Sequence, residues 1–218
     1  MSGRPPESVS PPGQSLRLRL TSRIMEHTLA YRLWQAPFAE QKLAPLFAHN
    51  DRLRGVRRVL DVGCGPGTNT HHFAGSQYLG VDHNPAYIEH ARRRHRREFL
   101  VADITRYEVS PRERFDFILV NSFLHHVDDA SVRRILAHLA TLLTDDGHLH
   151  ALELVMPARP SVARQLARYD RGEYPRPLAE WGRLFEAALE PAVFEPYPLV
   201  GLGVTLWDMV YFKGRARR

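Results

Sequence analysis

The chain has 218 residues, enough for one well-buried core, and its composition of 44% hydrophobic and 25% charged residues is ordinary for a globular protein. The single cysteine, Cys64, excludes an internal disulfide framework and favours a reducing compartment. No apolar run is long enough to span a membrane, and several prolines interrupt the place where a secretory signal would have its apolar region. The sequence therefore predicts a cytoplasmic protein without a membrane span.

The formal net charge of +6 raises the question of a nucleic-acid partner. The basic residues are nearly all arginines, and they are spread through the predicted helices rather than gathered around aromatic residues. One dense basic block, residues 92–97, comes at the end of a predicted helix, where cations suit the helix dipole. The pattern favours a solvated helix end over a nucleic-acid site, and we expect no nucleic-acid partner.

The first fifty residues divide into two parts. Residues 1–14 combine proline, serine and glycine, and we expect them to form a disordered tail. Residues 15–50 carry apolar residues at helical spacing, with Pro37 as a break between two helices, and this predicts a helical cap. The sequence shows neither an internal repeat nor a second core, so residues 15–218 are expected to form a single domain.

From residue 56 onward, strand patterns and helix patterns alternate. We predict strands at residues 56–62, 78–81, 99–102, 115–120 and 149–154, the last of them after a turn at Asp145-Asp146-Gly147. We predict helices from residue 68 to 73, from Pro85 to about residue 94, and from 131 to 143. This alternation is typical of parallel βαβ units and indicates a doubly wound sheet.

The last third of the chain has a different pattern. Residues 161–168 and 178–188 are predicted to be helices. Residues 192–197 and 204–212 are predicted to form a closing pair of antiparallel strands.

A glycine-rich turn follows the first predicted strand. The strand carries Asp61 near its end, and glycine then occupies three alternate positions, Gly63, Gly65 and Gly67. Glycine permits a tight turn and leaves no Cβ between the backbone and a ligand that lies across the strand ends. The turn therefore predicts a loop that binds a nucleotide-type cofactor.

The residues around the turn distinguish two kinds of cofactor. The dinucleotide fingerprint requires a glycine at position 68, where this chain has Thr68. The carboxylate of Asp61 beside the turn would repel a pyrophosphate, but it suits a cofactor that carries an ammonium and a sulfonium. An alternative for Asp61 is that it only caps the following turn.

Two further acids end the next two predicted strands. Asp82 can accept hydrogen bonds from both hydroxyls of a ribose, and Asp103 can accept one from an exocyclic adenine amine. Ile104 offers an apolar face to the same ring. An alternative for Asp103 is an ordinary surface acid. Because parallel strands end at one edge of a sheet, acids on three successive strands favour a sulfonium nucleoside.

At this point the sequence resembles the class I S-adenosylmethionine-dependent methyltransferases of the small-molecule type. The matching segments are residues 59–67, 78–82, 102–103, 115–121 and 142–149. The resemblance implies a Rossmann-like α/β fold with a doubly wound seven-stranded sheet of order 3-2-1-4-5-7-6, whose last strand is antiparallel. It also implies S-adenosylmethionine as the cofactor.

The resemblance further implies which residues surround the cofactor. The glycines and Cys64 would line its methionine part, Asp82 with the adjacent His83 its ribose, and Asp103 its adenine, while Asn121 would face it. Cys64 is expected to act through its backbone, because nothing nearby would activate its thiol. In the helical cap, Tyr31 and Gln35 lie one turn apart and either contact the cofactor or pack the helix.

The acceptor side is predicted from two segments. His125 and His126 follow the fourth strand, where a histidine either acts as general base for a hydroxyl acceptor or packs the loop, with Asp128 or Asp129 capping the next helix. Residues 155–190 are implied to be a substrate-side insertion. Within it, Arg171 or Arg176 would bind an acidic group and Tyr174 would pack on a ring, with a solvated loop as the alternative.

The sequence thus predicts methyl transfer from S-adenosylmethionine to a small-molecule, lipid or glycan-precursor acceptor. A non-catalytic scaffold or sensor that binds the same cofactor is the alternative, and methylation of RNA or protein is disfavoured. We expect no metal, because the twelve histidines show neither an H-E-x-x-H pattern nor a cysteine–histidine spacing. The acceptor itself cannot be predicted, because acceptor pockets in this fold are built from variable segments.

Overall fold

A computed structural model describes residues 38–169 and 173–217. The predicted tail, Tyr31, Gln35 and Arg171 lie outside the described residues. The chain divides into two units, residues 1–40 and 41–218, and the boundary falls within helix α2 (Ala39–Ala48). All the contacts described below lie within the second unit.

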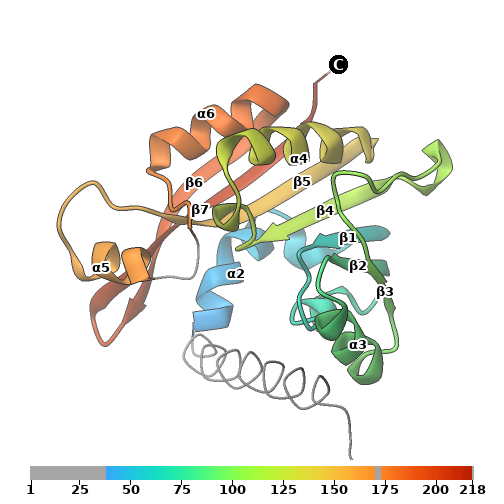
Figure 1. The fold of residues 1–218 in the computed structure, drawn as a ribbon, viewed down its shortest axis with the longest axis horizontal. Coiled ribbons are helices and arrows are strands. Elements are labelled where there is room, and N and C mark those ends of the chain that lie inside the picture. Colours follow the sequence, from blue (N-terminus) through green and yellow to red (C-terminus); the bar gives the residue numbers. More distant parts are fainter. Residues whose placement is uncertain (1–37, 170–172, 218) are drawn as a thin grey trace, which may run out of the picture. The chain divides into compact units, whose positions relative to one another are not determined.

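Seven strands form one sheet in the order β3-β2-β1-β4-β5-β7-β6 (Figure 1). Strands β1 to β5 are parallel to one another, and β7 runs antiparallel to both β5 and β6. The predicted order and the antiparallel last strand are confirmed. The bounds are β1 (Arg58–Val62), β2 (Gln77–Asp82), β3 (Glu98–Val101), β4 (Phe115–Asn121), β5 (Leu143–Val155), β6 (Leu189–Gly201) and β7 (Val204–Ala216).

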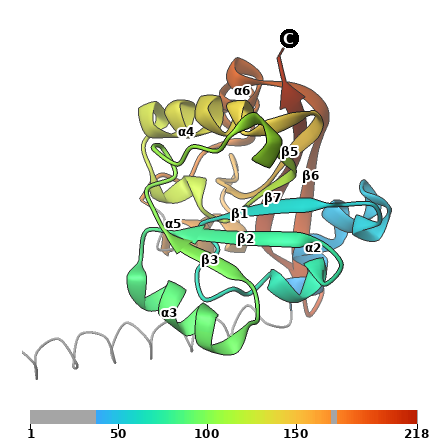
Figure 2. The same ribbon diagram turned by 90° about the vertical axis from the view of Figure 1, so that its right-hand side faces the viewer.

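Helices cover both faces of this sheet. Figure 2 shows α4 (Asp129–Thr141) and α6 (Leu178–Ala188) on one side and α3 (Pro85–Arg94) on the other. The hydrophobic core is divided in the same way: one cluster joins the sheet to α4 and α6, and the other joins it to α2 and α3. A further helix, α5 (Val162–Tyr169), follows β5 and packs against β7.

Local sequence signals explain where the helices begin. Asn84 caps α3, accepting a hydrogen bond from the N–H of Ala86 at 3.0 Å, and Pro85 takes the first helical position as predicted. Asp128 caps α4 through the N–H of Ser131 at 2.9 Å. The capping role that was the alternative for this aspartate is therefore present in the structure.

The helix predicted at residues 68–73 is wrong in type and length. The chain forms turns after Gly67 and then a 3₁₀ helix of four residues, Thr70–Phe73. The N–H of Ser76 already bonds to the carbonyl of Phe73 at 3.1 Å, and β2 begins at Gln77. Too few residues remain between the glycine turn and β2 for a longer α-helix.

The turn predicted at Asp145-Asp146-Gly147 is also wrong, because these residues lie within β5. They form a bulge: Phe115 of β4 pairs with Leu143, but Phe117 pairs with His148. A Cβ on Gly147 would lie 2.7 Å from the carbonyl oxygen of Phe115. The glycine therefore permits a close approach between strands, not a reversal of the chain.

The closing strands are longer than predicted. The sequence indicates residues 192–197 for the first of them, whereas β6 runs from Leu189 to Gly201 and includes Pro191, Pro196 and Pro198. Proline lacks the N–H that an interior strand must donate. These prolines are tolerated because β6 pairs only with β7 and forms the edge of the sheet.

Candidate cofactor and active site

The glycine loop lies at the carboxyl edge of the sheet, between the ends of β1 and β2. The N–H groups of Gly63 and Cys64 donate to the carbonyl of Val81 at 2.8 and 3.1 Å. All three glycines have positive φ angles, +66° at Gly63, +53° at Gly65 and +82° at Gly67, a region that favours glycine.

The three glycines differ in what surrounds them. A Cβ at Gly63 would lie 2.8 Å from the ring of Phe123, and one at Gly67 would lie 2.9 Å from the ring of His95. At Gly65 a Cβ would have nothing within 4 Å. The outer two glycines are therefore required by packing as well as by backbone conformation, while Gly65 keeps space open above the loop, where a ligand would lie.

Asp82 joins this loop to the start of α3. Its Oδ2 accepts a hydrogen bond from the N–H of Gly65 at 2.9 Å, and its Oδ1 accepts one from the N–H of Asn84 at 2.8 Å. Each oxygen keeps a lone pair that can accept from a further donor. The adjacent His83 is exposed, with its Nδ1 3.6 Å from Oδ1 of Asp82.

Asp61 lies beneath the loop and is fully buried. Its Oδ2 accepts hydrogen bonds from the hydroxyl of Tyr78 at 2.6 Å and from Nδ2 of Asn69 at 3.3 Å, while its Oδ1 has no partner among the described residues. Its partners are side chains, so it does not cap the backbone of the turn. Burial raises the pKa of Asp61 from 3.8 to about 6, although the two hydrogen bonds act in the opposite direction.

The polar chain continues from Asn69 to the end of β4. Nδ2 of Asn121 donates to Oδ1 of Asn69 at 3.3 Å, and Oδ1 of Asn121 is buried without a partner among the described residues. Two buried acceptor oxygens, one on Asp61 and one on Asn121, thus stand unpaired at this edge of the sheet. Buried acceptors are costly to leave unpaired, and the ammonium of a methionine group supplies the donors that they lack.

Tyr78 and Asn69 were not predicted as site residues. Tyr78 is the second residue of β2 and its sequence context predicts a buried strand residue, whereas Asn69 falls inside the segment predicted to be a helix. A buried aspartate at the end of β1 requires donors nearby. That requirement is the one signal that would have pointed to them.

Asp103 and Ile104 are placed less favourably for contacts with an adenine than the sequence suggests. The Asp103 side chain is 56% exposed, and its Oδ1 accepts from both the N–H and the hydroxyl of Thr105, which hold the pKa of the carboxyl below its usual value. Ile104 is only 7% exposed, within the core cluster on the α4 face. Little of its surface is left for an adenine ring, and the role of both residues stays a prediction.

Cys64 is buried within the loop. Burial raises the pKa of its thiol well above the usual range, and the carboxylates of Asp61 and Asp82 raise it further. The thiol therefore stays protonated at neutral pH, which is the state expected of a residue that acts through its backbone.

A buried histidine–glutamate pair joins the ends of β4 and β5. Glu153 is fully buried, and its Oε1 accepts hydrogen bonds from the N–H groups of Phe123 at 3.0 Å and Leu124 at 2.8 Å. Its Oε2 lies 2.7 Å from Nδ1 of His125. Because a carboxylate oxygen accepts hydrogen bonds, we assign the proton of this contact to Nδ1 of His125.

Glu153 was not predicted from the sequence, and it distinguishes the two histidines. His125 is 3% exposed and oriented by the carboxylate, whereas His126 is exposed, with the two ring centroids 4.3 Å apart. Ser122, three residues before His125, has a φ of +53°, which is strained for serine. Backbone strain of this kind concentrates at functional sites.

Comparisons with known proteins agree with this geometry. Residues 59–147 match the family model of a methyltransferase domain. The ubiquinone biosynthesis O-methyltransferase of Bradyrhizobium diazoefficiens is 36% identical over 98 residues, which cover 43% of this chain and 38% of that protein. The trans-aconitate 2-methyltransferase of Escherichia fergusonii is 32% identical over 102 residues, covering 44% and 39%. Residues 59–147 of this chain are therefore similar to the methyltransferase domains of known proteins.

Solved structures show the same fold. The 1,6-didemethyltoxoflavin-N1-methyltransferase of Burkholderia thailandensis has a TM-score of 0.66 at 19% identity and covers 98% of this chain and 93% of its own. A methyltransferase from Methanosarcina mazei has a TM-score of 0.65 at 19% identity and covers 78% and 98%. The matches to the two curated relatives span less than two fifths of those proteins, 38% and 39%.

Within the methyltransferase fold, Arg176 has a different role from the one predicted. It is 3% exposed, and its guanidinium donates to the carboxylate of Asp129 at 2.7 Å and to the carbonyls of Leu124 and Val127 at 3.1 and 2.7 Å. The Cζ atom of Arg176 also lies over the ring of Trp181, 4.9 Å from the ring centroid. Because these donors are committed to the protein, Arg176 holds the loop after β4 in place and does not bind an acidic group of the acceptor.

Tyr174 lies beside the histidine pair. Its N–H donates to the carbonyl of His125 at 3.0 Å, and its side chain is 41% exposed. This position next to His125 is compatible with the predicted contact to an acceptor ring, which stays a prediction.

Two arginines of the dense basic block, residues 92–97, make structural hydrogen bonds. Arg92 donates to the carbonyl of Phe99 at 3.1 and 2.5 Å, and Arg97 donates to the carbonyl of Ser76 at 2.9 Å. Arg92 therefore links α3 to β3, and Arg97, which lies between α3 and β3, contacts the residue before β2. Among the described residues no group of three or more His, Cys, Asp or Glu is placed to hold a metal ion, and no described helix is long and apolar enough to cross a membrane.

A pocket of about 650 Å³ lies at the opposite, amino edge of the sheet. It is lined by residues between positions 49 and 57, which precede β1, and by residues of β4 and β5, among them the ion pair of Arg57 with Asp116. None of the predicted cofactor or acceptor residues lines it. The pocket is therefore separate from the site at the carboxyl edge.

Proposed function

We propose that this chain transfers the methyl group of S-adenosylmethionine to the oxygen of a small-molecule acceptor. The observation that carries the proposal is the buried pair of His125 and Glu153 at the ends of β4 and β5, next to the glycine loop at the same edge of the sheet. The proposal also includes a cytoplasmic location and no nucleic-acid partner, both of which are supported by composition alone.

The residues at the end of β1 and β2 suit the cofactor. Asp82 would accept from the ribose hydroxyls while its bonds to Gly65 and Asn84 hold it in place. Asp61 and Asn121 supply acceptor oxygens and negative charge for a cationic methionine group. The bound cofactor supplies an electrophilic methyl on a sulfonium, and the protein's work is then to align an acceptor and take its proton.

His125 would take that proton. With Nδ1 held by Glu153, Nε2 is the atom that accepts the proton of an acceptor hydroxyl as the new oxygen–carbon bond forms and the sulfur–carbon bond breaks. The proton then leaves the imidazole to solvent. Glu153 acts as a positioning residue, because it fixes the ring and the loop without contacting the acceptor.

A second candidate is a scaffold that binds the cofactor without turnover. The observation that favours it is the burial of His125, which is only 3% exposed and also fits a histidine that ties the loop to β5. The two candidates differ in what His125→Asn does, because asparagine keeps a donor for Glu153 but cannot act as a base.

The test is turnover with labelled S-adenosylmethionine against a panel of small phenols and hydroxy acids. We expect the native chain to methylate one class of these, and His125→Asn to lower kcat by about 100-fold or more with cofactor affinity unchanged. His126→Asn, which changes the exposed neighbour, is the matched control and should leave kcat nearly unchanged. Cofactor binding without turnover across the panel would favour the scaffold, and full activity of His125→Asn would exclude this histidine as the base.

A further inference from the structure

Exposed apolar side chains are concentrated in one part of the sequence. Of the eight large hydrophobic residues that are exposed in the described part of the chain, seven fall between positions 162 and 204. Leu202 is fully exposed, at 106%, and Tyr169 is 85% exposed. The seven are Val162, Tyr169, Tyr174, Phe194, Val200, Leu202 and Val204. Where exposed apolar side chains form a contiguous group, they mark an interaction surface.

The turn between β6 and β7 holds Leu202 away from the protein. β6 ends at Gly201 and β7 begins at Val204, and both turn residues have positive φ, +50° at Leu202 and +76° at Gly203. Positive φ at both positions is the geometry of a tight two-residue hairpin turn, in which leucine is strained. A strained, fully exposed leucine is costly for the free protein, which indicates that its side chain is needed there.

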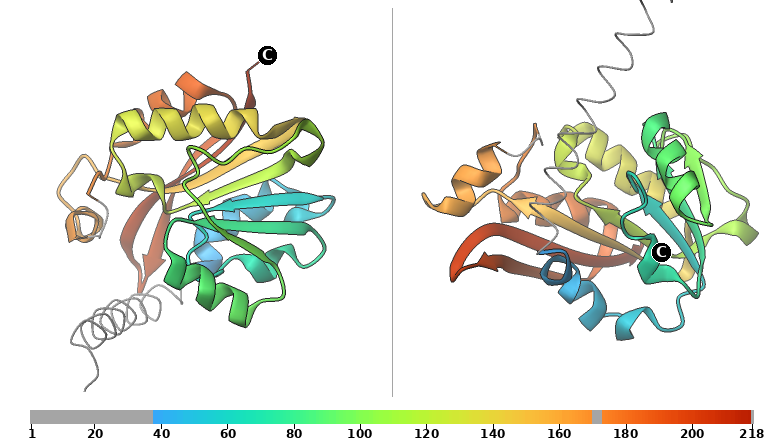
Figure 3. Two further views of the ribbon diagram at one scale, coloured as in Figure 1. Left: turned by 45° about the vertical axis from the view of Figure 1, so that its right-hand side comes forward. Right: turned by 90° about the horizontal axis from the view of Figure 1, so that it is seen from below.

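The hairpin extends past the neighbouring strand. The last residue of β5, Val155, pairs with Asp208, so residues 204–207 and the turn before them continue beyond β5. Figure 3 shows the end of the hairpin and α5 at the same end of the second unit, and α5 packs against β7. We call the hairpin end, residues 200–204, together with α5 the apolar end.

The charge beside this hairpin is positive. Residues 156–169 contain three arginines, Arg159, Arg164 and Arg168, and the first acidic residue after them is Asp170. Within α5, Ala163 and Ala167 are buried, whereas Val162 and Arg168 are exposed. A short helix that presents apolar and arginine side chains to solvent beside a protruding apolar turn has the composition of an element that lies on a membrane surface.

We propose that the apolar end binds the surface of an anionic lipid bilayer. Val200, Leu202 and Val204 would enter the interfacial region, while Arg159 and Arg168 would pair with lipid phosphates. The protruding shape favours this occupant over a folded protein, because a bilayer accepts an apolar projection without a matching pocket, whereas a protein interface requires complementary packing over about 800 Å² on each side. The exposed side chains of Arg159 and Arg168 complement the negative charge of the lipid.

The test is sedimentation of the full chain with vesicles, without cofactor or acceptor, so its outcome is independent of methyl transfer. We expect binding to vesicles of phosphatidylcholine with about 30% phosphatidylserine, weaker binding to pure phosphatidylcholine, and loss of binding at high salt. Leu202→Ser should lower the partition coefficient about tenfold. Arg159→Ala with Arg168→Ala should lower it about 25-fold, at about fivefold for each arginine.

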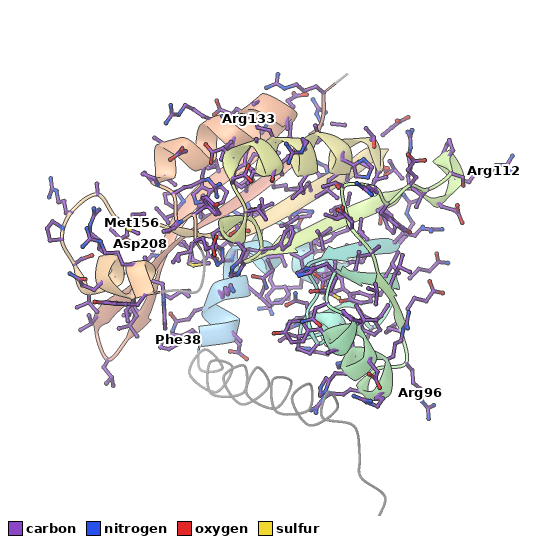
Figure 4. All side chains as sticks on the ribbon, in the orientation of Figure 1. Phe38, Arg96, Arg112, Arg133, Met156 and Asp208 are labelled. Carbon is purple, nitrogen blue, oxygen red and sulfur yellow. The ribbon has the colours of Figure 1, made fainter. Side chains whose placement is uncertain are left out.

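A matched control removes two arginines from the opposite end of the second unit. Arg96 and Arg112 are exposed and lie at the opposite end of the unit from Met156 and Asp208 (Figure 4). Arg96→Ala with Arg112→Ala should change lipid binding by less than twofold, and unchanged melting temperatures would show that all variants fold.

Three results would overturn the proposal. The first is no binding of the native chain to the anionic vesicles. The second is an equal loss of binding in the control double variant, which would mean that net charge alone is responsible. The third is a dimer in analytical ultracentrifugation that Leu202→Ser dissociates while lipid binding is absent, which would assign the surface to a second copy of the chain.

Discussion

The site has a cofactor end, formed by the glycine loop and Asp82, and an acceptor end, formed by His125 and Glu153. The contacts that stabilise these two ends join residues at different separations in the sequence. At the cofactor end, the N–H of Gly65 bonds to Asp82, which follows 17 residues later, and most contacts use the backbone of one loop. At the acceptor end, Glu153 holds His125 across 28 residues, and Arg176 bonds to Val127 across 49. The first end rests on a compact motif, whereas the second rests on buried side chains brought together by the sheet.

This difference predicts that changes at the acceptor end affect folding and catalysis together, whereas changes at the cofactor end affect binding with less effect on the fold. The glycine loop makes most of its contacts through backbone groups, which a side-chain substitution does not remove. A buried carboxylate with three partners leaves several groups unpaired when it is removed.

The largest combined effect is expected at Glu153. Glu153→Ala leaves two backbone N–H groups and the imidazole of His125 without their acceptor, and we expect unfolding to become easier by about 3 kcal/mol. Glu153→Gln keeps an acceptor oxygen and should fold, but it should lower kcat because the imidazole loses its charged partner. Chemical denaturation with turnover measurements checks both, and native kcat in Glu153→Gln would remove its positioning role.

Arg176 should affect stability but not cofactor binding. Arg176→Ala removes donors to Asp129 and to two buried carbonyls, so we expect a loss of about 2–4 kcal/mol in the free energy of unfolding. Affinity for S-adenosylmethionine should stay within about threefold. Arg168→Ala, which removes an exposed arginine from α5, is the control for unfolding and should change stability little. A large loss of cofactor affinity in Arg176→Ala would contradict the separation between the two ends.

Asp61→Asn should show the reverse pattern, with a higher free energy of unfolding and weaker cofactor binding. Since burial raises the pKa of this carboxyl from 3.8 to about 6, the folded state holds its proton more tightly, and the stability from that proton is present below pH 3.8 and is lost as the pH rises through about 6. Asp61→Asn is neutral at every pH, so we expect it to be more stable than the native chain at pH 7 by about 1–3 kcal/mol, with the advantage gone near pH 4. Thermal unfolding across this range measures it.

The same substitution should weaken cofactor binding at neutral pH by about tenfold, because the cationic methionine group loses a negative charge. In the native chain, affinity should fall as the pH is lowered through about 6, where Asp61 takes up its proton. Asp61→Asn should flatten that dependence. An unchanged pH profile in the variant would show that Asp61 does not face the cofactor's charge.

The two ends also differ in how much of them could be predicted from the sequence. The glycine loop, the acid at the end of β2 and the caps of α3 and α4 depend on residues close together in the chain, and their positions follow from local rules. Glu153 reads from the sequence as one acid in an apolar strand, and its pairing with His125 follows only from the register of β5 beside β4.

The wrong predictions have the same origin. From residue type and local context, Arg176 was predicted to bind an acidic group and Asp145-Asp146-Gly147 to form a turn. Their actual roles depend on distant partners, the loop after β4 for the arginine and the backbone of Phe115 for the glycine. Long-range pairing overrides local preference at these positions, and no local pattern reveals it.

The central claim is that S-adenosylmethionine binds at the carboxyl edge between the glycine loop and Asp82, and titration calorimetry with Asp82→Ala tests it most directly. The native chain should bind S-adenosylmethionine at a one-to-one ratio, and the variant should lose at least about 100-fold in affinity while keeping a cooperative unfolding transition, since its carboxylate is the expected partner of both ribose hydroxyls. Native affinity in a folded Asp82→Ala variant would contradict the account.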